Sequence, residues 1–447
     1  MTDKKEKKII IIFGLILILF LSIFLSLWSV VSGGYDKQNK IILFLKEIIP
    51  TKISRQIRDT IFVIPKLKEE RKLLRLIVQK YEQKLEGNLF NEKIISSKNL
   101  NNNYKLKEFF IPFTRINLDK GWQSDENAFT KHYLEIDNDK VIIASGGGEI
   151  IYFEKKNIKN QKLKQIKIKN NILKLLNDKK FMGIRDLYLD KDKKIYISLY
   201  FEDTNGYSVN IYSADLNYKE LEFKLFFETN EYWKDFTVRT GGRINSFKDN
   251  KILFTLGDFG NEKSPQNLNS LKGKIISIDK TNKEFKIISL GHRNQQGLLY
   301  LNDINVIINS EHGPKGGDEI NLNFLKKKEP LNFGWAISSY GTGYSGQDKY
   351  EKSHKKFGFV EPFKFYDPSI GISQIDFNYE RKTLFISSLR AGSIFKLKID
   401  KSFNKIISED RIFFPEERIR DIKYDEETSS LFLIFERVPS FAVLKLN

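Results

Sequence analysis

One hairpin pattern recurs six times between residues 133 and 436, and it constrains the fold more than any other feature of this 447-residue chain. Each copy is a short β-type run, a tight turn rich in Asp, Asn or Lys, and a second, more apolar run. Their spacing is irregular but mostly about fifty residues, the repeat length of propeller blades with four strands each. We therefore predict an all-β, six-bladed β-propeller over residues 105–447, with a large β-sandwich as the competing interpretation. The copies begin at Tyr133, Asp186, Ile244, Leu298, Gln374 and Asp421.

The segments that flank these hairpins carry an unusual number of arginines. If every turn lies at one end of the blades, the segments before the first runs and after the second runs meet at the opposite end. Clustered guanidinium groups repel one another unless they pair with carboxylates or phosphates. The sequence thus predicts a mouth that binds a small polyanion, whereas any single arginine could equally be a solvated surface group. The arginines in question are Arg185, Arg239, Arg243, Arg293, Arg390, Arg418 and Arg420.

A run of polar residues, GHRNQQGL at 291–298, stands directly before the fourth hairpin. Consecutive polar residues of this kind fit neither a helical stripe nor an alternating strand face. They predict a loop that holds a ligand.

The N-terminal region predicts a membrane anchor. Residues 9–31 form an uncharged apolar run long enough to cross a bilayer as a helix. Four lysines in the tail at 1–8 precede it, so positive-inside logic leaves that tail in the cytoplasm and sends the rest across the membrane. A cleaved signal peptide is the alternative, but such peptides use apolar regions of roughly 7–15 residues.

Residues 32–104 are predicted to be a helical stalk followed, from residue 88, by a polar linker. Residues 1–104 also hold half of the net charge of +18, with 19 Lys+Arg against 10 Asp+Glu. Anionic lipid headgroups explain a basic segment beside a membrane more simply than nucleic acid does, and no aromatic stacking motif for nucleic acid is evident. The absence of cysteine excludes disulfides, thiolate metal sites and cysteine nucleophiles.

Several of these motifs together resemble the soluble aldose dehydrogenase (glucose/sorbosone dehydrogenase) family. They are LGHRNQQGL, SEHGPKGGDEINL followed by NFGWA, TGGRI leading to FTLGD, LNSLKGKIISID, SLRAGSIFKLKID and ERIRDI. The resemblance covers about residues 105–447 and implies a six-bladed propeller that binds pyrroloquinoline quinone (PQQ), a planar tricarboxylate with an ortho-quinone, and that oxidises a sugar.

The resemblance also implies roles for individual residues. Arg293 and Asn294 would contact the quinone edge, Gln296 would help to position the cofactor, and Arg418 and Arg420 would face its carboxylates. Arg390 stands where the family usually has lysine, and Gln295 where it commonly has proline. The main-chain carbonyls of Gly313 and Pro314 would bind a calcium ion bridged to PQQ, and Asp318 and Glu319 are candidates for a second calcium.

One departure bears on catalysis. In the family a histidine two residues before the Gly-Gly-Arg triplet removes the proton of the sugar hydroxyl, and here that position is Arg239. Arginine stays protonated in proteins and cannot act as a base. None of the four histidines is an obvious replacement by spacing, although His132 and His354 stay candidates, and His292 and His312 are expected to be structural.

The sequence therefore predicts a membrane-anchored, periplasmic, quinoprotein-like sugar dehydrogenase with PQQ and calcium as cofactors and an unidentified electron acceptor. Because of Arg239, the alternative is a non-catalytic propeller that binds an acidic saccharide, a peptide or an envelope partner.

Overall fold

The computed structural model describes most of the predicted propeller. The predicted tail (1–8), the anchor (9–31) and the stalk up to residue 88 lie outside the described residues. Within the part that is described, no helix combines the length and the apolar character needed to span a membrane. The described residues are 89–97, 103–111, 131–176, 179–248, 250–325, 330–344, 348–414, 417–436 and 439–446.

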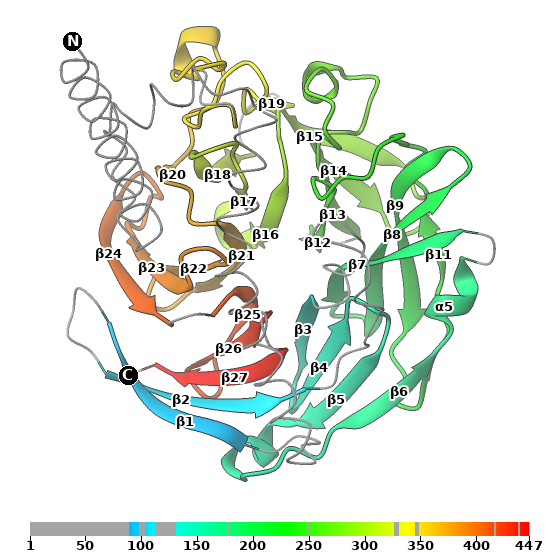
Figure 1. Cartoon of the computed structure of the whole chain (residues 1–447), viewed down its shortest axis with the longest axis vertical. Helices are drawn as coiled ribbons and strands as arrows, with labels where there is room; N and C mark the ends of the chain where they lie inside the picture. Colours follow the sequence, from blue (N-terminus) through cyan, green and yellow to red (C-terminus); the bar gives the residue numbers. More distant parts are fainter. Residues whose placement is uncertain are drawn as a thin grey trace, which may run out of the picture. The chain divides into compact units, whose positions relative to one another are not determined.

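These residues form six β-sheets around a common centre (Figure 1), which we number as blades in chain order. From the centre outward, blade 1 contains β3 (His132–Asp137), β4 (Lys140–Ser145), β5 (Ile150–Glu154), β6 (Ile166–Asn170) and β10 (Glu220–Leu221). Blade 2 contains β7 (Lys180–Leu189), β8 (Lys194–Asp203), β9 (Gly206–Asp215) and β11 (Lys224–Phe227). Blade 3 contains β12 (Gly241–Phe247), β13 (Lys251–Leu256), β14 (Lys274–Asp279), β15 (Phe285–Leu290) and β19 (Leu331–Asn332).

The second half of the ring follows the same plan. Blade 4 contains β16 (Gln295–Leu301), β17 (Val306–Glu311), β18 (Asp318–Phe324) and β20 (Lys364–Tyr366), and blade 5 contains β21 (Ile372–Asn378), β22 (Thr383–Ser388), β23 (Ser393–Ile399) and β24 (Ile406–Phe413). Blade 6 contains β25 (Ile419–Asp425), β26 (Ser430–Phe435), β27 (Ser440–Lys445), β2 (Asn103–Phe110) and β1 (Leu89–Ser96). Neighbouring strands are antiparallel, except that β10 and β19 join their sheets in parallel. The short helices are η1 (Lys155–Lys159), α5 (Ile172–Leu175), η2 (Ser264–Gln266), η3 (Asn302–Ile304) and η4 (Lys355–Phe357).

The ring closes on itself, which confirms the six-bladed propeller and excludes the sandwich. The inner strands contact one another in the order β3, β7, β12, β16, β21 and β25, and β25 returns to β3. A buried hydrophobic cluster lies at each of the six junctions between neighbouring blades. Burial of apolar side chains between the sheets therefore stabilises the whole circle.

Each of the six hairpins predicted from the sequence forms the two innermost strands of one blade. Each hairpin turn also contains one non-glycine residue in the left-handed region of φ, which a tight turn requires. In chain order these residues are Asn138, Lys193, Lys248, Asn305, Lys382 and Ser429.

Blade 6 corrects the predicted domain boundary. Strand β2 pairs with β27, and β1 pairs with β2, so the N-terminal side of the propeller completes the last blade. Figure 1 shows these strands beside each other, in blue and red. The linker predicted at 88–104 is therefore wrong for Leu89–Ser96, which form β1, and for residues 103 and 104, which begin β2. The strand was missed because β1 is an outer edge strand, and much of it is exposed and polar.

Carboxylates of the inner strands connect neighbouring blades. Asp186 on β7 accepts a hydrogen bond from the backbone N–H of Ile244 on β12 at 2.7 Å, and its other oxygen accepts from Arg243 at 2.8 Å. Asp421 on β25 accepts from the N–H of Leu134 on β3 at 2.9 Å. These bonds satisfy buried backbone donors that no strand of their own sheet reaches.

Candidate functional site

Irregular pairing at the start of the inner strands positions several of the predicted site residues. Strands β12, β16, β21 and β25 each shift register within their first residues, and β7 shifts register both there and again at Arg185, in its middle. The single extra residues of three of these bulges are Arg185, Gln296 and Arg420. The extra residue of a bulge has no partner on the neighbouring strand, and its side chain departs from the regular alternation between the two faces of the sheet.

Arg420 forms the most fully bonded ion pair of the site. Its Nε and Nη2 lie 2.7 and 2.6 Å from Oε2 of Glu436, and its Nη1 donates to Oε1 of Gln296 at 3.2 Å. Nη2 of Arg418 lies 3.7 Å from Oε1 of the same glutamate. Although burial would raise the pKa of Glu436, Arg420 and Arg418 lower it to about 2. Glu436 is therefore a permanent anion between the two arginines.

Two further cations, Lys131 and Arg185, complete a group that we call the basic cluster (Lys131, Arg185, Arg418 and Arg420). Burial lowers the pKa of Lys131 well below its ordinary value, and the charges of Arg185 and Arg420 lower it further, whereas Glu436 raises it. The sequence analysis identified the three arginines but missed Lys131 and Glu436. The available signal was position, because Lys131 precedes the inner strand β3 directly.

The loop predicted at 291–298 is a loop only over residues 291–294, because strand β16 begins at Gln295, and Arg293 and Asn294 lie in this shorter loop. Arg293 donates from Nη1 to the carbonyl oxygen of His312 at 3.0 Å and from Nη2 to the hydroxyl of Tyr344 at 3.4 Å. Its guanidinium lies 5.3 Å from the ring centre of Trp335. Oδ1 of Asn294 accepts from the side-chain amide of Gln296 at 3.0 Å, and Gln296 in turn accepts from Arg420. The loop is thus joined to the basic cluster.

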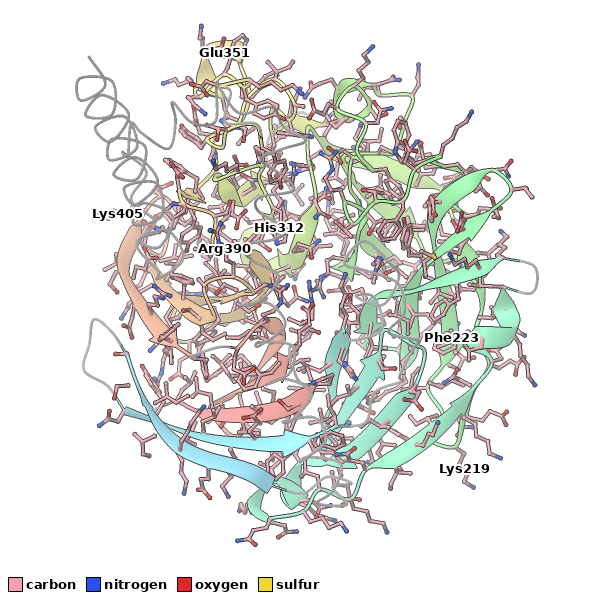
Figure 2. The ribbon with its side chains drawn as sticks, in the orientation of Figure 1. Lys219, Phe223, His312, Glu351, Arg390 and Lys405 are labelled. Carbon is pink, nitrogen blue, oxygen red and sulfur yellow. The ribbon has the colours of Figure 1, made fainter. Side chains whose placement is uncertain are left out.

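The two histidines near the loop are both held by hydrogen bonds. His292 is buried, with Nδ1 3.2 Å from Oε1 of Glu311 and Nε2 2.8 Å from Oγ of Ser289. His312 hydrogen-bonds through Nε2 to the carbonyl oxygen of Ile372. Figure 2 shows His312 on the side of its blade that faces the centre of the ring. Burial lowers the pKa of His312, and both Arg293 and Arg420 lower it further although Asp318 raises it. The charge of Arg293 on the loop and the charge of Arg420 in the basic cluster therefore both act on the pKa of His312.

Arg239 is held by a buried carboxylate. Its Nη1 lies 3.1 Å from Oδ2 of Asp258, and the same oxygen accepts from Nε1 of Trp335 at 2.8 Å. The other oxygen of Asp258 accepts from the backbone N–H of Gly260 at 2.8 Å. Burial raises the pKa of Asp258, whereas Arg239 and Arg293 lower it. The position that a base would occupy therefore holds a cation with its counter-ion, and the sequence analysis did not identify Asp258.

The two pairs of predicted calcium ligands have different surroundings. Asp318 uses both carboxylate oxygens for the backbone, accepting from the N–H of Gly313 at 3.2 Å and of Ile372 at 3.0 Å. Glu319 is buried, and burial raises its pKa well above the ordinary value, with a further rise from nearby Glu311. The carbonyl of Pro314 accepts from Ser369 at 3.4 Å. Among the described residues, no group of three or more His, Asp or Glu side chains is arranged to hold a metal.

A small pocket of about 10 Å³ lies beside Glu319, with room for one water-sized particle. Its lining includes Glu311, Glu319, Gly313, Arg293 and Trp335.

Four of the seven predicted arginines lie outside the basic cluster: Arg239 and Arg293, described above, and Arg243 and Arg390. Arg243 is buried, and its Nη1 lies 2.8 Å from Oδ1 of Asp186 and 3.8 Å from Oδ1 of Asp421. It therefore connects blade 3 with blades 2 and 6. Arg390 is exposed on the segment after β22. The charges that act most strongly on Glu436 are those of Arg420, Arg418 and Lys131, and Arg390 is not one of them.

The described site of this six-bladed propeller combines the basic cluster, a polar loop and the ion pair of Arg239 with Asp258. Comparison with known proteins makes this specific. The family model for glucose/sorbosone dehydrogenases matches residues 132–439, and this chain belongs to that family.

The relatives support the same grouping. The Synechocystis protein slr1608 is 30% identical over 212 residues, which cover 41% of this chain and 50% of the relative. The aldose sugar dehydrogenase YliI of Escherichia coli is 27% identical over 204 residues, which cover 41% of this chain and 53% of the relative. The chain thus spans about half the length of these curated relatives. The PQQ-bound aldose sugar dehydrogenase of Streptomyces coelicolor has the same fold, with a TM-score of 0.52 at 17% identity over 76% of this chain and 98% of the relative.

Proposed function

We propose that this chain is a quinoprotein-like sugar dehydrogenase that oxidises an aldose or a related polyol with PQQ as hydride acceptor. Membership of the glucose/sorbosone dehydrogenase family and the PQQ-bound relative support this assignment. The observation that carries it is the excess of cations around one carboxylate, Glu436, at the mouth of the propeller.

The donors present fit a planar tricarboxylate. The basic cluster places three guanidinium groups and the amine of Lys131 around the carboxylate of Glu436. The side chain of Arg418 is 38% exposed and within reach of a ligand. Nε of Arg293 is buried without a hydrogen-bond partner among the described residues. Because guanidinium groups bind carboxylates with paired hydrogen bonds, this surplus favours a ligand with several negative charges.

Each residue can then be given a task. Arg418 would bind a carboxylate of the cofactor, and Arg420 would do so or hold Gln296 and Glu436 in position. Arg293 and Asn294 would meet the quinone edge, and Arg390 would be an outer contact at most. PQQ bound there would supply an ortho-quinone that accepts a hydride from the sugar, while the protein provides orientation and charge.

Calcium is part of the same proposal. The carbonyls of Gly313 and Pro314 would bind one ion, and Glu319 would take part in a second site. A carboxylate whose pKa is raised by burial and by another carboxylate gains most from a cation nearby, and calcium prefers oxygen ligands. Asp318 is the weaker candidate, because both of its oxygens already accept backbone hydrogen bonds.

Arg239 favours a second candidate function, a propeller that binds an acidic saccharide, a peptide or an envelope partner without oxidising it. General-base catalysis needs a group whose pKa can approach the working pH. An arginine paired with buried Asp258 offers no such group. If the chain is active, we expect its turnover to be slow.

We also propose that residues 9–31 anchor the chain in the cytoplasmic membrane, with the propeller in the periplasm. The apolar run and the lysines before it support this orientation. Electrons would then pass to a membrane quinone or to a small redox protein.

Titration of the full chain with PQQ in the presence of calcium tests the cofactor assignment. We expect micromolar or tighter binding, observed by quenching of tryptophan fluorescence. Arg293→Gln should weaken it by about tenfold or more, as expected for the loss of hydrogen bonds to a charged group. Arg381→Gln, an exposed arginine in the β21–β22 turn, is the matched control and should bind as the wild type does. No binding at 100-fold higher PQQ would favour the non-catalytic alternative.

A further inference from the structure

The outer part of blade 1 concentrates positive charge far from the site described above. Residues 154–176, which include η1, β6 and α5, contain eight lysines, one glutamate and neither arginine nor aspartate. This short stretch therefore has a net charge of +7, whereas the whole 447-residue chain has +18. The proposed oxidation gives these lysines no task.

Most of these lysines are exposed. Only Lys155 is buried, and its Nζ lies 2.9 Å from Oδ1 of Asp425. Lys219 joins the group, because its carbonyl accepts the backbone N–H of Lys169 on β6 at 3.2 Å. Figure 2 shows Lys219 on the outer edge of the ring. The exposed group, which we call the lysine patch, consists of Lys156, Lys159, Lys162, Lys164, Lys167, Lys169, Lys174 and Lys219.

Nearby carboxylates neutralise only part of the lysine patch. Nζ of Lys156 lies 2.6 Å from Oε2 of Glu154, and Nζ of Lys167 lies 2.9 Å from Oε1 of Glu149. The other six lysines of the patch form no ion pair with any described residue, although Glu220 and Glu222 are exposed at its border. Because cations gathered on one surface repel one another, this surface is suited to a partner with many negative charges.

An exposed leucine accompanies the lysine patch. Leu173 on α5 is 69% exposed, whereas its neighbour Ile172 is buried. Oδ1 of Asn170 accepts the N–H of Ile172 at 3.1 Å, and the side chain of Asn171 exchanges two hydrogen bonds with the backbone of Phe223, at 2.9 and 3.0 Å. These bonds fix α5 in place, so Leu173 is presented to solvent by a well-held turn.

We propose that the lysine patch lies against a bilayer that contains anionic lipids, with Leu173 entering the headgroup region. The outer edge of blade 1 then faces the membrane. Lysines are compact charges that attract a diffuse negative surface, and an apolar side chain beside them gains free energy by leaving water. Residues 154–176 contain no aromatic side chain that could stack on nucleic-acid bases.

This inference goes beyond the proposed oxidation. It rests on the proposed function only for the compartment, because the anchor at 9–31 would hold the propeller close to a bilayer and raise the local concentration of the patch there.

The full chain in lipid nanodiscs tests the contact. The chain contains no cysteine, so a dye can be attached to a single introduced thiol, as in Gln161→Cys, an exposed position inside the patch. Lipids with a nitroxide headgroup should quench this dye more strongly in discs that contain phosphatidylglycerol than in discs of phosphatidylcholine alone. The difference should disappear in 1 M salt, where the screening length is about 3 Å. Equal quenching in both kinds of disc at low salt would overturn the inference.

A dye on the other side of the ring is the control. Asn404→Cys is an exposed position beside Lys405, which Figure 2 shows across the ring from Lys219. Its dye should be quenched equally in both kinds of disc.

Two matched sets of substitutions test the lysines themselves. The triple variant Lys162→Gln, Lys164→Gln and Lys169→Gln should lose the difference between the discs. The triple variant Lys398→Gln, Lys401→Gln and Lys405→Gln removes the same charge from exposed positions of blade 5 and should keep the difference. Equal behaviour of the two variants would contradict a role of the lysine patch.

Failure of the anchor can be distinguished from failure of the lysine patch. If alkaline carbonate washes the full chain off the discs, the anchor proposal fails, and sedimentation with phosphatidylglycerol vesicles tests the patch by itself. The patch variant should then bind these vesicles about tenfold more weakly or worse, and Leu173→Ser about fivefold more weakly. Absence of wild-type binding, or tighter binding of an oligonucleotide or of polyglutamate than of the vesicles, would overturn the inference.

Discussion

At the scale of single residues, the proposed function gives Arg239 the position of a general base. A histidine in its place would face Asp258, whose Oδ2 now accepts from Arg239, and a carboxylate of this kind orients a histidine base. We predict that Arg239→His raises the rate of dye-linked aldose oxidation by the PQQ-loaded chain by at least about tenfold, the lower range for a positioned base. Arg239→Gln, which adds no base, should not raise it. Equal rates in both variants would contradict this role.

Glu436 gives the basic cluster a pH dependence of stability. Its pKa is about 2 in the folded chain, below the ordinary value of 4.5. A carboxyl group with a lowered pKa stabilises the fold above its unfolded pKa and loses that contribution as the pH falls. We predict that Glu436→Gln is less stable than the wild type at pH 6 by up to about 3 kcal/mol. The difference should shrink between pH 4.5 and pH 3 in urea unfolding, and a constant difference would count against the ion pair.

At the scale of elements, the bonds between inner strands hold the blades in register. Asp421 accepts the N–H of Leu134, and its removal would leave a buried donor without a partner. We predict that Asp421→Ala lowers the free energy of unfolding by about 1–3 kcal/mol. Asp421→Asn should cost less, since an amide oxygen can still accept and burial already raises the pKa of Asp421. Asp215→Ala, whose native side chain is 90% exposed, is the control for urea denaturation. Equal losses at positions 421 and 215 would contradict the role.

The strands also show which parts of the fold could be predicted from the sequence. The six hairpins were predictable because each repeats a local pattern of turn residues and apolar runs, and all six are inner strand pairs. Strand β1 was not predictable, because an outer strand exposes much of its length and lacks that pattern.

The site was predictable only in part for a related reason. Arg293, Asn294, Gln296, Arg418 and Arg420 lie in motifs that can be read locally. Lys131, Asp258 and Glu436 lie in no motif that can be read locally. Glu436 meets Arg420 across the β25–β26 hairpin, and Asp258 meets Arg239 across the β12–β13 hairpin. Arg420 was expected to face a ligand, and Glu436 and Gln296 take up three of its five N–H donors.

At the scale of the whole molecule, the N-terminal side of the propeller closes the ring. Strand β2 covers the edge of β27, and Tyr104, Leu106 and Phe109 are buried in the two junctions of blade 6. We predict that a chain beginning at residue 112 loses cooperative thermal unfolding or is insoluble, because it exposes this core and an open strand edge. A chain beginning at Lys80, where the compact unit starts, should unfold cooperatively. Equal melting curves would contradict closure by β1 and β2.

The central claim for the whole molecule is that cations from several blades surround one multiply charged ligand at the mouth of the ring. A crystal structure of the chain with PQQ and calcium tests it most directly. The account predicts a PQQ carboxylate within about 3 Å of Arg418, the distance of charge-assisted hydrogen bonds, with the quinone edge toward Arg293. PQQ bound elsewhere, or a mouth without ligand density at saturating PQQ, would contradict it.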